Sequence, residues 1–187
     1  MEVKSEYTMN EEFVLMMGNY DGLGNRITRV VNGKDEILVN KPFLNIIDKN
    51  LLRLGSDFAG ALHSSKDVLG SNIKMHPLKI NKKLEIWLLP TKSYKHHKCV
   101  IFSLMHIKNV RPLGVKKTEV TTSYGHTIEI DMKFSAFNHK RQKAHDLRDI
   151  MSRNIDSPSN SDIKPIKGFY IHENSGEFKF TKYGEDD

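Results

Sequence analysis

Cysteine, long apolar runs and centrally placed acids are what this 187-residue sequence has least of. The single cysteine, Cys99, excludes an intrachain disulfide framework and is typical of a reducing compartment. No run of about 18 apolar residues is present, so we expect no membrane span. The first residues lack the basic-then-apolar order of a secretion signal. Together these absences predict a soluble, cytoplasmic protein.

Acidic residues are almost missing between Lys74 and Lys117. This stretch contains eleven Lys and Arg residues against one acid, Glu85, so its charge is +10, whereas the whole chain carries +6. Aligned cations gain free energy by releasing counterions from phosphates, so the stretch indicates a surface that binds a polyanion. Lysines that merely solvate the polar faces of strands would give the same count. Charge alone leaves both interpretations open.

The scarcity of carboxylates argues against an enzyme. Glu85 and Glu119 are the only acids over residues 74–128, too few for a general acid/base pair there. Structural zinc needs ligands at two well-spaced ends, whereas here one cysteine stands alone among histidines. On one continuous strand, Cys99 and His106 would lie too far apart for a nucleophile–base pair. We predict no catalytic residue, no metal and no cofactor, and a buried structural role for Cys99.

Short apolar segments bounded by turn residues predict a strand-rich first part of the chain. We expect strands over residues 12–17, 26–31, 34–39, 73–80, 84–89 and 98–110. Asn32-Gly33 is a strong two-residue hairpin signal, and it predicts Ile27 opposite Leu38 and Arg29 opposite Glu36.

A second hairpin is predicted around the three-residue loop Ser123-Tyr124-Gly125. This register places Val120 opposite Ile128, with Gly125 free to adopt the left-handed conformation that such loops need. By contrast, the glycines at 18, 22 and 24 lack the Gly-Lys-Ser/Thr ending of a phosphate loop, so we interpret them as a turn. Trp87 lies in an apolar run, and we expect it in the core rather than stacked on a base.

Helical periodicity is clearest over residues 136–153, with Ser135 as the expected N-cap. The apolar stripe of this helix consists of Phe137, Ala144, Leu147 and Met151. A shorter helix is predicted over residues 57–69 with Ser56 as its N-cap, whereas residues 43–54 are apolar without a clean period. Only one strong helix is therefore expected, which disfavours a helix-turn-helix.

The fold class that follows is α+β, dominated by antiparallel hairpins, with one long helix toward the C-terminal side. We expect a strand-rich DNA-binding domain over residues 1–155. A linker over residues 156–166 is indicated by its Ser, Pro, Asn and Asp content. Residues 167–187 would form a short tail that is either a small hairpin or a regulatory segment.

A series of short motifs within residues 36–153 resembles the ComK family of competence transcription factors. The motifs are Lys41-Pro42, Ile47-Asp48, Gly55-Ser56-Asp57-Phe58-Ala59-Gly60, His76-Pro77, Leu88-Leu89-Pro90-Thr91, Lys98-Cys99, Ser103, His106, Thr118-Glu119-Val120-Thr121, Gly125, Ser135-Ala136-Phe137 and Leu147-Arg148. The resemblance implies a transcriptional activator of DNA-uptake genes. It also implies that the protein binds paired A/T-rich boxes in the minor groove as a dimer or larger assembly, with contact to RNA polymerase as a further expectation.

The resemblance further implies control by an adaptor protein that delivers the chain to a Clp-type protease. The family's adaptor-binding segment lies near the C-terminus and is rich in Phe, Leu and Tyr. Its nearest match in this sequence is Phe169, Tyr170 and Ile171, followed by His172 where the family has proline.

The basic stretch and the long helix supply the predicted DNA contacts. The narrow minor groove of A/T-rich DNA attracts Lys, Arg and His, and a stretch with one arginine suits it better than guanine readout in the major groove. The predicted contact residues are Lys74, Lys79, Lys82, Lys83, Lys92, Lys95, His96, His97, Lys98, Lys108, Arg111, Lys140, Arg141 and Lys143. The alternative is an interaction protein whose basic face docks an acidic partner without binding DNA.

Overall fold

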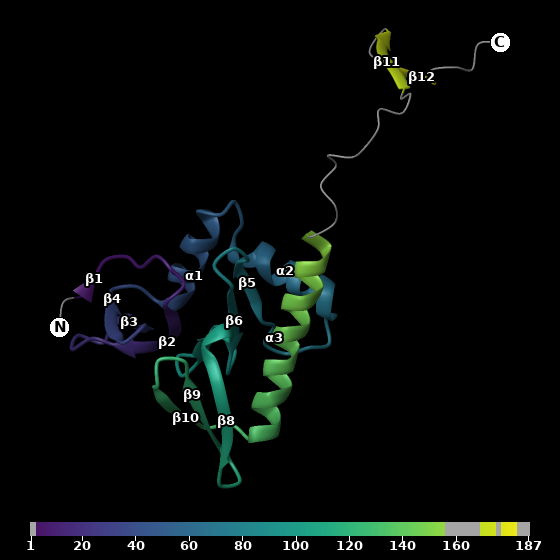
Figure 1. Ribbon diagram of the computed structural model, residues 1–187. Coiled ribbons are helices and arrows are strands. Elements are labelled where there is room, and N and C mark those ends of the chain that lie inside the picture. Colours follow the sequence, from purple (N-terminus) through teal and green to yellow (C-terminus); the bar gives the residue numbers. More distant parts are fainter. Residues whose placement is uncertain (1–2, 156–168, 175–176, 183–187) are drawn as a thin grey trace. The chain divides into compact units, whose positions relative to one another are not determined.

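A computed structural model describes residues 3–155, 169–174 and 177–182 of the chain (Figure 1). The chain divides into two units, Met1–Asn154 and Ile155–Asp187. The predicted fold class is confirmed, because the first unit combines antiparallel sheets with three α-helices, the longest of which comes last. No helix among the described residues is both long and apolar enough to cross a bilayer.

The first unit contains a seven-stranded sheet and a three-stranded sheet. The larger sheet has the order β1-β4-β3-β2-β7-β6-β5 and is antiparallel except for the β1–β4 pair. Its strands are β1 (Val3–Lys4), β2 (Phe13–Tyr20), β3 (Arg26–Asn32), β4 (Asp35–Val39), β5 (Leu78–Asn81), β6 (Ile86–Pro90) and β7 (Val100–Ser103). The smaller sheet has the order β10-β9-β8, with β8 (Ile107–Leu113), β9 (Lys117–Thr122) and β10 (Thr127–Ile130).

The middle of the larger sheet is buried on both faces. On one face, Ile86 and Leu88 of β6 join a cluster that includes residues of α1 (Phe43–Leu52) and α2 (Phe58–Leu69). On the other face, Trp87 and Leu89 join residues of α3 (Phe134–Ile155) and of the smaller sheet. The alternation follows from the two-residue period of a strand. Trp87 is fully buried, as predicted.

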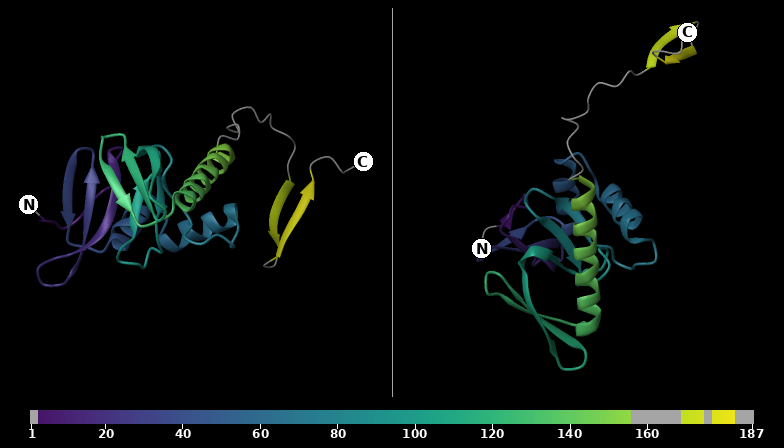
Figure 2. Two further views of the ribbon diagram at one scale, coloured as in Figure 1. Left: turned by 90° about the horizontal axis from the view of Figure 1, so that it is seen from below. Right: turned by 45° about the vertical axis from the view of Figure 1, so that its right-hand side comes forward.

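The long helix α3 packs through the predicted stripe. Phe137, Ala144 and Leu147 are fully buried, and the Phe137 ring meets Phe102 of β7 edge to face with 5.8 Å between ring centroids. Figure 2 shows α3 as one continuous helix beside the strands. The predicted N-cap is wrong, because α3 already begins at Phe134 and Ser135 lies within its first turn.

One ion pair also connects α3 to the sheet. Glu85, which immediately precedes β6, accepts hydrogen bonds from Arg148 of α3 and from the Trp87 indole nitrogen, each at 3.1 Å. The one acid of the basic stretch is therefore used within the fold rather than opposing the neighbouring lysines.

The two predicted hairpins have different outcomes. The β9–β10 hairpin is confirmed, with Val120 opposite Ile128 and Gly125 at φ +84°. In the β3–β4 hairpin the predicted register is wrong by two residues, because Arg29 lies opposite Leu38.

The reason for the shifted register is the place of the glycine. Gly33, at φ +59°, is the first of two central turn residues, so the turn is Gly33-Lys34 rather than Asn32-Gly33. A two-residue shift keeps every side chain on its predicted face. Arg29 still forms an ion pair with Glu36, at 3.0 Å, but as diagonal neighbours.

Two predicted strands are shorter or interrupted. The segment 73–80 becomes extended only at Leu78, the residue after Pro77. The segment 98–110 is divided between β7 and β8 by a 3₁₀ turn, η1 (Leu104–His106). This turn transfers the chain from the larger sheet to the smaller one.

Residues 43–52 form a helix that the sequence pattern did not predict. The helix α1 precedes α2 directly, so two adjacent helices do exist, contrary to expectation. The N-cap of α2 is Asp57, whose carboxylate accepts from the Gly60 amide, rather than Ser56. Within α2 the cation Lys66 is offset by Asp67, so its surface lacks the positive charge typical of a DNA recognition helix.

In the second unit, β11 (Phe169–Asn174) and β12 (Glu177–Lys182) pair in antiparallel fashion, with Asn174 opposite Glu177. The predicted adaptor-binding segment Phe169–Ile171 begins β11. The predicted linker, 156–166, lies outside the described residues.

Buried Asn50 fastens the N-terminal segment to α1. Its side-chain amide donates to the Tyr7 and Ile46 carbonyls at 3.0 and 2.8 Å, and its oxygen accepts from the Met9 amide at 2.8 Å. We expect Asn50→Ala to destabilise the protein by about 2–4 kcal/mol, because buried backbone groups lose their partners. Urea unfolding measures this loss. The matched control is Asn45→Ala on the exposed face of the same helix, expected within about 0.5 kcal/mol of wild type. Equal effects of the two substitutions would contradict the assigned role of Asn50.

Gly18 of β2 allows the turn that follows β6 to approach closely. A Cβ at position 18 would lie 2.7 Å from the His97 carbonyl oxygen, whereas a Cβ at Gly22 would contact nothing within 4 Å. We expect Gly18→Ala to lower stability by about 1–3 kcal/mol and to shift the amide resonances of residues around His97. Gly22→Ala is the control and should leave both unchanged. Unaltered resonances in Gly18→Ala would refute the close approach.

Candidate nucleic-acid interface

The connection between β6 and β7 forms a basic turn, which we define as residues 92–98. Two successive reversals shape it, since the His96 amide donates to the Ser93 carbonyl and the Cys99 amide to the His96 carbonyl, at 2.8 and 2.9 Å. Two buried side chains anchor it. The Tyr94 hydroxyl donates to the His76 carbonyl at 3.0 Å, and the Cys99 thiol contacts the Lys92 carbonyl at 3.2 Å.

This anchoring leaves the cationic side chains of the basic turn outside. Lys95, His96, His97 and Lys98 are exposed, and Lys92 is half-buried. Local desolvation, then the charges of Lys92, His97 and Lys98, lower the pKa of His96. Its ring stacks on that of His97 with 4.9 Å between centroids. Because its pKa is lowered, His96 takes up a proton only at a lower pH than free imidazole does. Its protonation is disfavoured because the surrounding surface is already positive.

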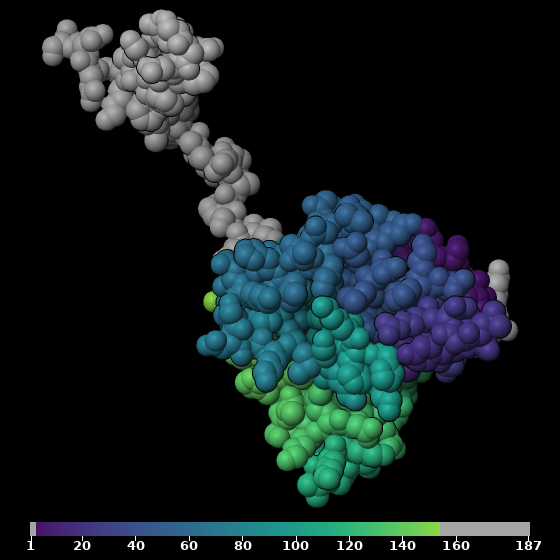
Figure 3. Space-filling view, turned by 180° about the vertical axis from the view of Figure 1, so that it is seen from behind, coloured from purple at the N-terminus to yellow at the C-terminus, as the bar shows by residue number. Residues whose placement is uncertain are grey.

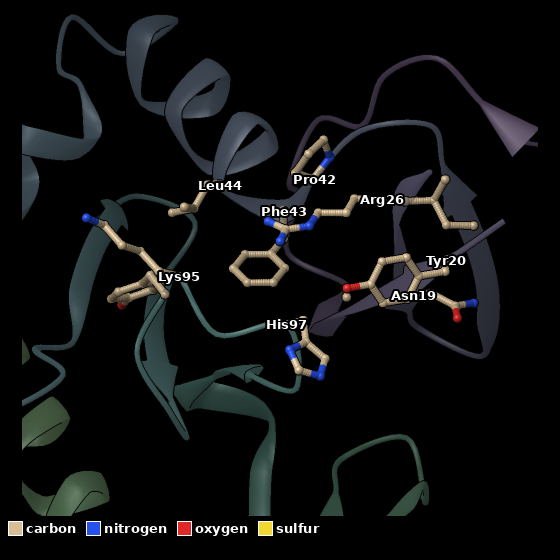
Figure 4. Close-up of a pocket in the computed structure, with 11 residues that line it drawn as sticks. Asn19, Tyr20, Arg26, Pro42, Phe43, Leu44, Lys95 and His97 are labelled. Carbon is tan, nitrogen blue, oxygen red and sulfur yellow. The ribbon is translucent and has the colours of Figure 1, made fainter. Parts of the chain in front are cut away.

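The basic turn borders an apolar pocket of about 260 Å³. The buried side chains of Ile27, Phe43 and Tyr94 line it, with Lys95 and His97 at its edge. In Figure 4 the Arg26 guanidinium lies close to the Phe43 ring, and the Tyr20 hydroxyl points toward the side of the pocket where Phe43 lies. Neither Arg26 nor Lys95 forms an ion pair within the described part of the chain.

Arg26 was absent from the predicted contact set. It lies some seventy positions earlier in the chain than the basic turn, and no local pattern links the two. Strand β2 pairs with both β3 and β7, and only this pairing brings Arg26 and the basic turn to the same end of these three strands.

A second group of predicted cations gathers in a groove beside α3, which we call the α3 groove. It has a volume of about 450 Å³ and is lined by the predicted Lys74, Lys140 and Lys143 and by His139, which was not in the predicted set, without an acidic side chain. Helical spacing places the last three beside the apolar stripe. Burial lowers the pKa of Lys140, whose ammonium contacts the Met75 sulfur at 3.5 Å.

The N-terminal turn of α3 adds to this positive potential. Ser135 and Ala136 line the same groove, and the unpaired amides at the start of a 22-residue helix carry partial positive charge. An ion pair with Asp146 at 3.4 Å offsets part of the charge of Lys143, but Lys74 and Lys140 form no ion pair among the described residues. The groove therefore has the chemistry of a site for backbone phosphates.

A third group lies on the hairpin of β8 and β9, which we call the β8–β9 arm. Lys108 and Arg111 were predicted, whereas the exposed Lys116 and Lys117 were not. The glycine turn followed directly by two lysines, Gly114-Val115-Lys116-Lys117, is a local signal that could have identified them. Arg111 is held on the arm by Glu119, to which it donates two hydrogen bonds at 2.5 and 2.9 Å. These bonds lower the pKa of Glu119.

The remaining predicted cations serve the fold as well as the surface. The Arg141 guanidinium contacts the Ile107 carbonyl at 3.5 Å, and its Nε is buried. Lys82 donates to the Ser152 carbonyl near the end of α3 at 3.3 Å. Lys79 is half-buried on β5, and Lys83 is exposed in the turn before β6. The predicted set thus separates into the basic turn, the α3 groove, the β8–β9 arm and these flanking residues.

The histidines weighed as metal ligands have other partners. His76 contacts the Gly70 carbonyl at 2.9 Å, and His106 contacts the Ser123 hydroxyl at 2.6 Å and the Glu11 carbonyl at 2.8 Å. Among the described residues, no three His, Cys, Asp or Glu side chains are grouped as metal ligands would be. Cys99 is fully buried, as predicted, and burial raises the pKa of its thiol.

Comparison with known proteins agrees with the resemblance seen in the sequence motifs. The family model described as ComK protein matches residues 4–156, nearly the whole first unit. The competence transcription factor of Bacillus subtilis (strain 168) is 26% identical over 133 residues, which is 71% of this chain and 69% of that relative. No solved structure matches the chain. Because the family model covers well over half of the sequence, this chain belongs to the ComK family of competence transcription factors.

Proposed function

We propose that this chain activates transcription of competence genes by binding A/T-rich duplex DNA, mainly through the minor groove. The observation that carries the proposal is the large excess of cations over acids in the central stretch, which remains even though Arg111 and Lys117 pair with Glu119 and Glu129 from outside it. Of its twelve charged residues eleven are cations, and the one acid, Glu85, is paired internally with Arg148. The basic turn, the α3 groove and the β8–β9 arm therefore present cations to solvent, as a phosphate-binding surface requires.

Lysine and histidine dominate these surfaces, which favours shape over base readout. Recognition of guanine in the major groove mostly uses bidentate arginine, and Arg111 already has a bidentate carboxylate partner in Glu119. A narrow A/T-rich minor groove needs only compact cations, because its negative potential is enhanced. The adjacent helices α1 and α2 do not change this preference, since α2 carries no excess positive charge.

Paired A/T boxes would be bound by a homo-oligomer. Each copy would cover one box, and boxes about one helical turn apart would present the same groove to two copies related by symmetry. The tail segment Phe169–Ile171 would serve as the site for a protease adaptor, and a contact with RNA polymerase would complete activation.

A gel-shift experiment tests the proposal against the alternative of a basic protein that docks an acidic partner. The probe is a duplex with two A/T boxes, competed with G/C-rich duplex and with a minor-groove drug. Selective displacement by the drug, together with weak competition by G/C-rich duplex, supports minor-groove binding. Equal competition by both duplexes would contradict sequence-selective binding, and absence of any shift would leave the acidic partner as the better explanation.

Salt dependence gives a quantitative prediction. If six to ten phosphates are neutralised, affinity should fall by about 10³–10⁵ between 50 and 200 mM salt. Fluorescence anisotropy of a labelled A/T-box duplex measures the slope of log affinity against log salt. A slope near zero would contradict a phosphate-based interface.

Neutralising the basic turn should weaken binding to every sequence. We expect Lys95→Ala/Lys98→Ala to reduce the magnitude of the salt slope by about 1.8, because two phosphate contacts are lost. The charge-matched control is Lys34→Ala/Lys66→Ala, which removes two exposed lysines elsewhere and should leave the slope unchanged. Equal slopes for the two double variants would mean that the basic turn does not contact DNA.

A further inference from the structure

The β8–β9 arm projects from the body of the first unit. It is the lowest part of the molecule in Figure 1, and it forms the pointed lower end of the surface in Figure 3. The arm is held along its length, because Ile107 at its base and Val120 at its middle are buried. Near the turn, Thr118 is also buried, and its hydroxyl donates to the Met132 carbonyl at 2.7 Å. The far end, Gly114-Val115-Lys116, connects Leu113 to its partner Lys117.

The tip of this arm carries an exposed apolar side chain next to two lysines. Val115 is 83% exposed at the turn, and Lys116 and Lys117 follow it directly. Over residues 107–122 the arm has four cations and one acid, a net charge of +3. That acid, Glu119, is occupied by Arg111. A single exposed apolar residue is common on protein surfaces, but one that stands next to cations on a hairpin turn suits a surface that is apolar inside and anionic outside.

Duplex DNA is such a surface, with stacked bases between two rows of phosphates. Proteins that bind the minor groove often insert an apolar side chain between neighbouring base pairs and hold the flanking phosphates with cations. Partial unstacking of one step kinks the duplex by about 20–90°. A/T-rich sequences contain TA steps, which are among the easiest to kink.

The construction of the arm suits this task. The strand β8 is an edge strand of the smaller sheet. Pro112 has no backbone N–H, so this edge has one donor fewer and is less suited to pairing with another strand. Lys117 is 3.7 Å from Glu129, a long ion pair between exposed side chains. Lys108 and Lys116 form no ion pair among the described residues, so both are available to phosphates.

We infer that the β8–β9 arm is the element that deforms DNA, with Val115 as a wedge at a minor-groove step, Lys116 and Lys117 on the flanking phosphates, and Lys108, near the base of the arm, on phosphates farther from that step. The inference rests on the proposed DNA binding and adds to it the element that enters the groove. The basic turn and the α3 groove then position the duplex, whereas the arm selects sequences that kink readily.

The test measures binding and bending separately on one A/T-box duplex labelled at both ends. Anisotropy reports affinity, and energy transfer between the end labels reports the bend. We expect Val115→Ser to abolish most of the change in energy transfer and to weaken affinity by about 5- to 20-fold. Val115→Leu should retain both, because leucine is also an effective wedge. The matched control is Leu23→Ser, which removes an apolar side chain that is 89% exposed at a different turn and should bend DNA as the wild type does.

A second duplex tests the wedge from the DNA side. A duplex with one unpaired base at the kinked step has already lost most of its stacking there, so it should restore the affinity of Val115→Ser to within about twofold of wild type. No restoration would overturn insertion at that step.

Three further outcomes separate the inference from its foundation. A Val115→Ser protein that bends DNA like the wild type would overturn the wedge while leaving DNA binding intact. A change in the mass of the free Val115→Ser protein, measured by sedimentation, would identify the tip as a contact between copies and would also overturn it. Failure of the wild-type chain to bind the duplex would refute the proposed function, and the wedge with it. Circular dichroism melts of the variants exclude unfolding as the cause of any loss.

Discussion

Burial of β6 and β7 on both faces is the constraint on which the rest of the molecule depends. Ile86 and Leu88 face the cluster beneath α1 and α2, whereas Trp87 and Leu89 face the cluster beneath α3 and the smaller sheet. No charged side chain can occupy such strands without a large desolvation penalty. The lysines of the central stretch are therefore confined to the turns that join these strands, to the edge strand β5 and to the hairpin beyond. The cationic surfaces are thus a consequence of how the core is built, and each is held in place by a buried strand directly beside it.

The position of Glu85 also affects how the cationic surfaces are arranged. Its ion pair with Arg148 is partly exposed, so its contribution to stability is modest, on the order of 1 kcal/mol or less. Its larger effect is geometric, because it joins the start of β6 to α3 on the side where Trp87 is buried. The same helix carries Lys140 and Lys143 into the α3 groove. The one acid of the central stretch therefore helps to position the helix that carries Lys140 and Lys143.

Local chemistry was sufficient to predict the elements that depend on it. The β9–β10 hairpin could be predicted because Gly125 fixes its loop, and α3 because its stripe at Phe137, Ala144 and Leu147 is regular. The helix α1 could not, since it buries Asn50 together with its apolar residues, and two of the three partners that satisfy this amide, Tyr7 and Met9, lie more than forty residues away. The position of Arg26 depends in the same way on pairing between distant strands. What sequence patterns could not supply was the separation of the predicted cations into several surfaces, because that depends on which cations the fold turns inward, as it does with Arg141.

This separation bears on how specificity can arise. Lysines on a turn and in a groove act as point charges, which fix the position of a duplex without distinguishing its bases. Discrimination must then come from the shape of the DNA and from the energy needed to deform it. Under the proposed function, a narrow minor groove would strengthen the attraction of every cation, and a readily kinked step would lower the cost of the insertion inferred for the tip of the arm. Both properties are found in A/T-rich sequences, so a protein with few base-reading side chains can still be selective, provided that positioning charges and an exposed apolar tip are carried by one folded unit.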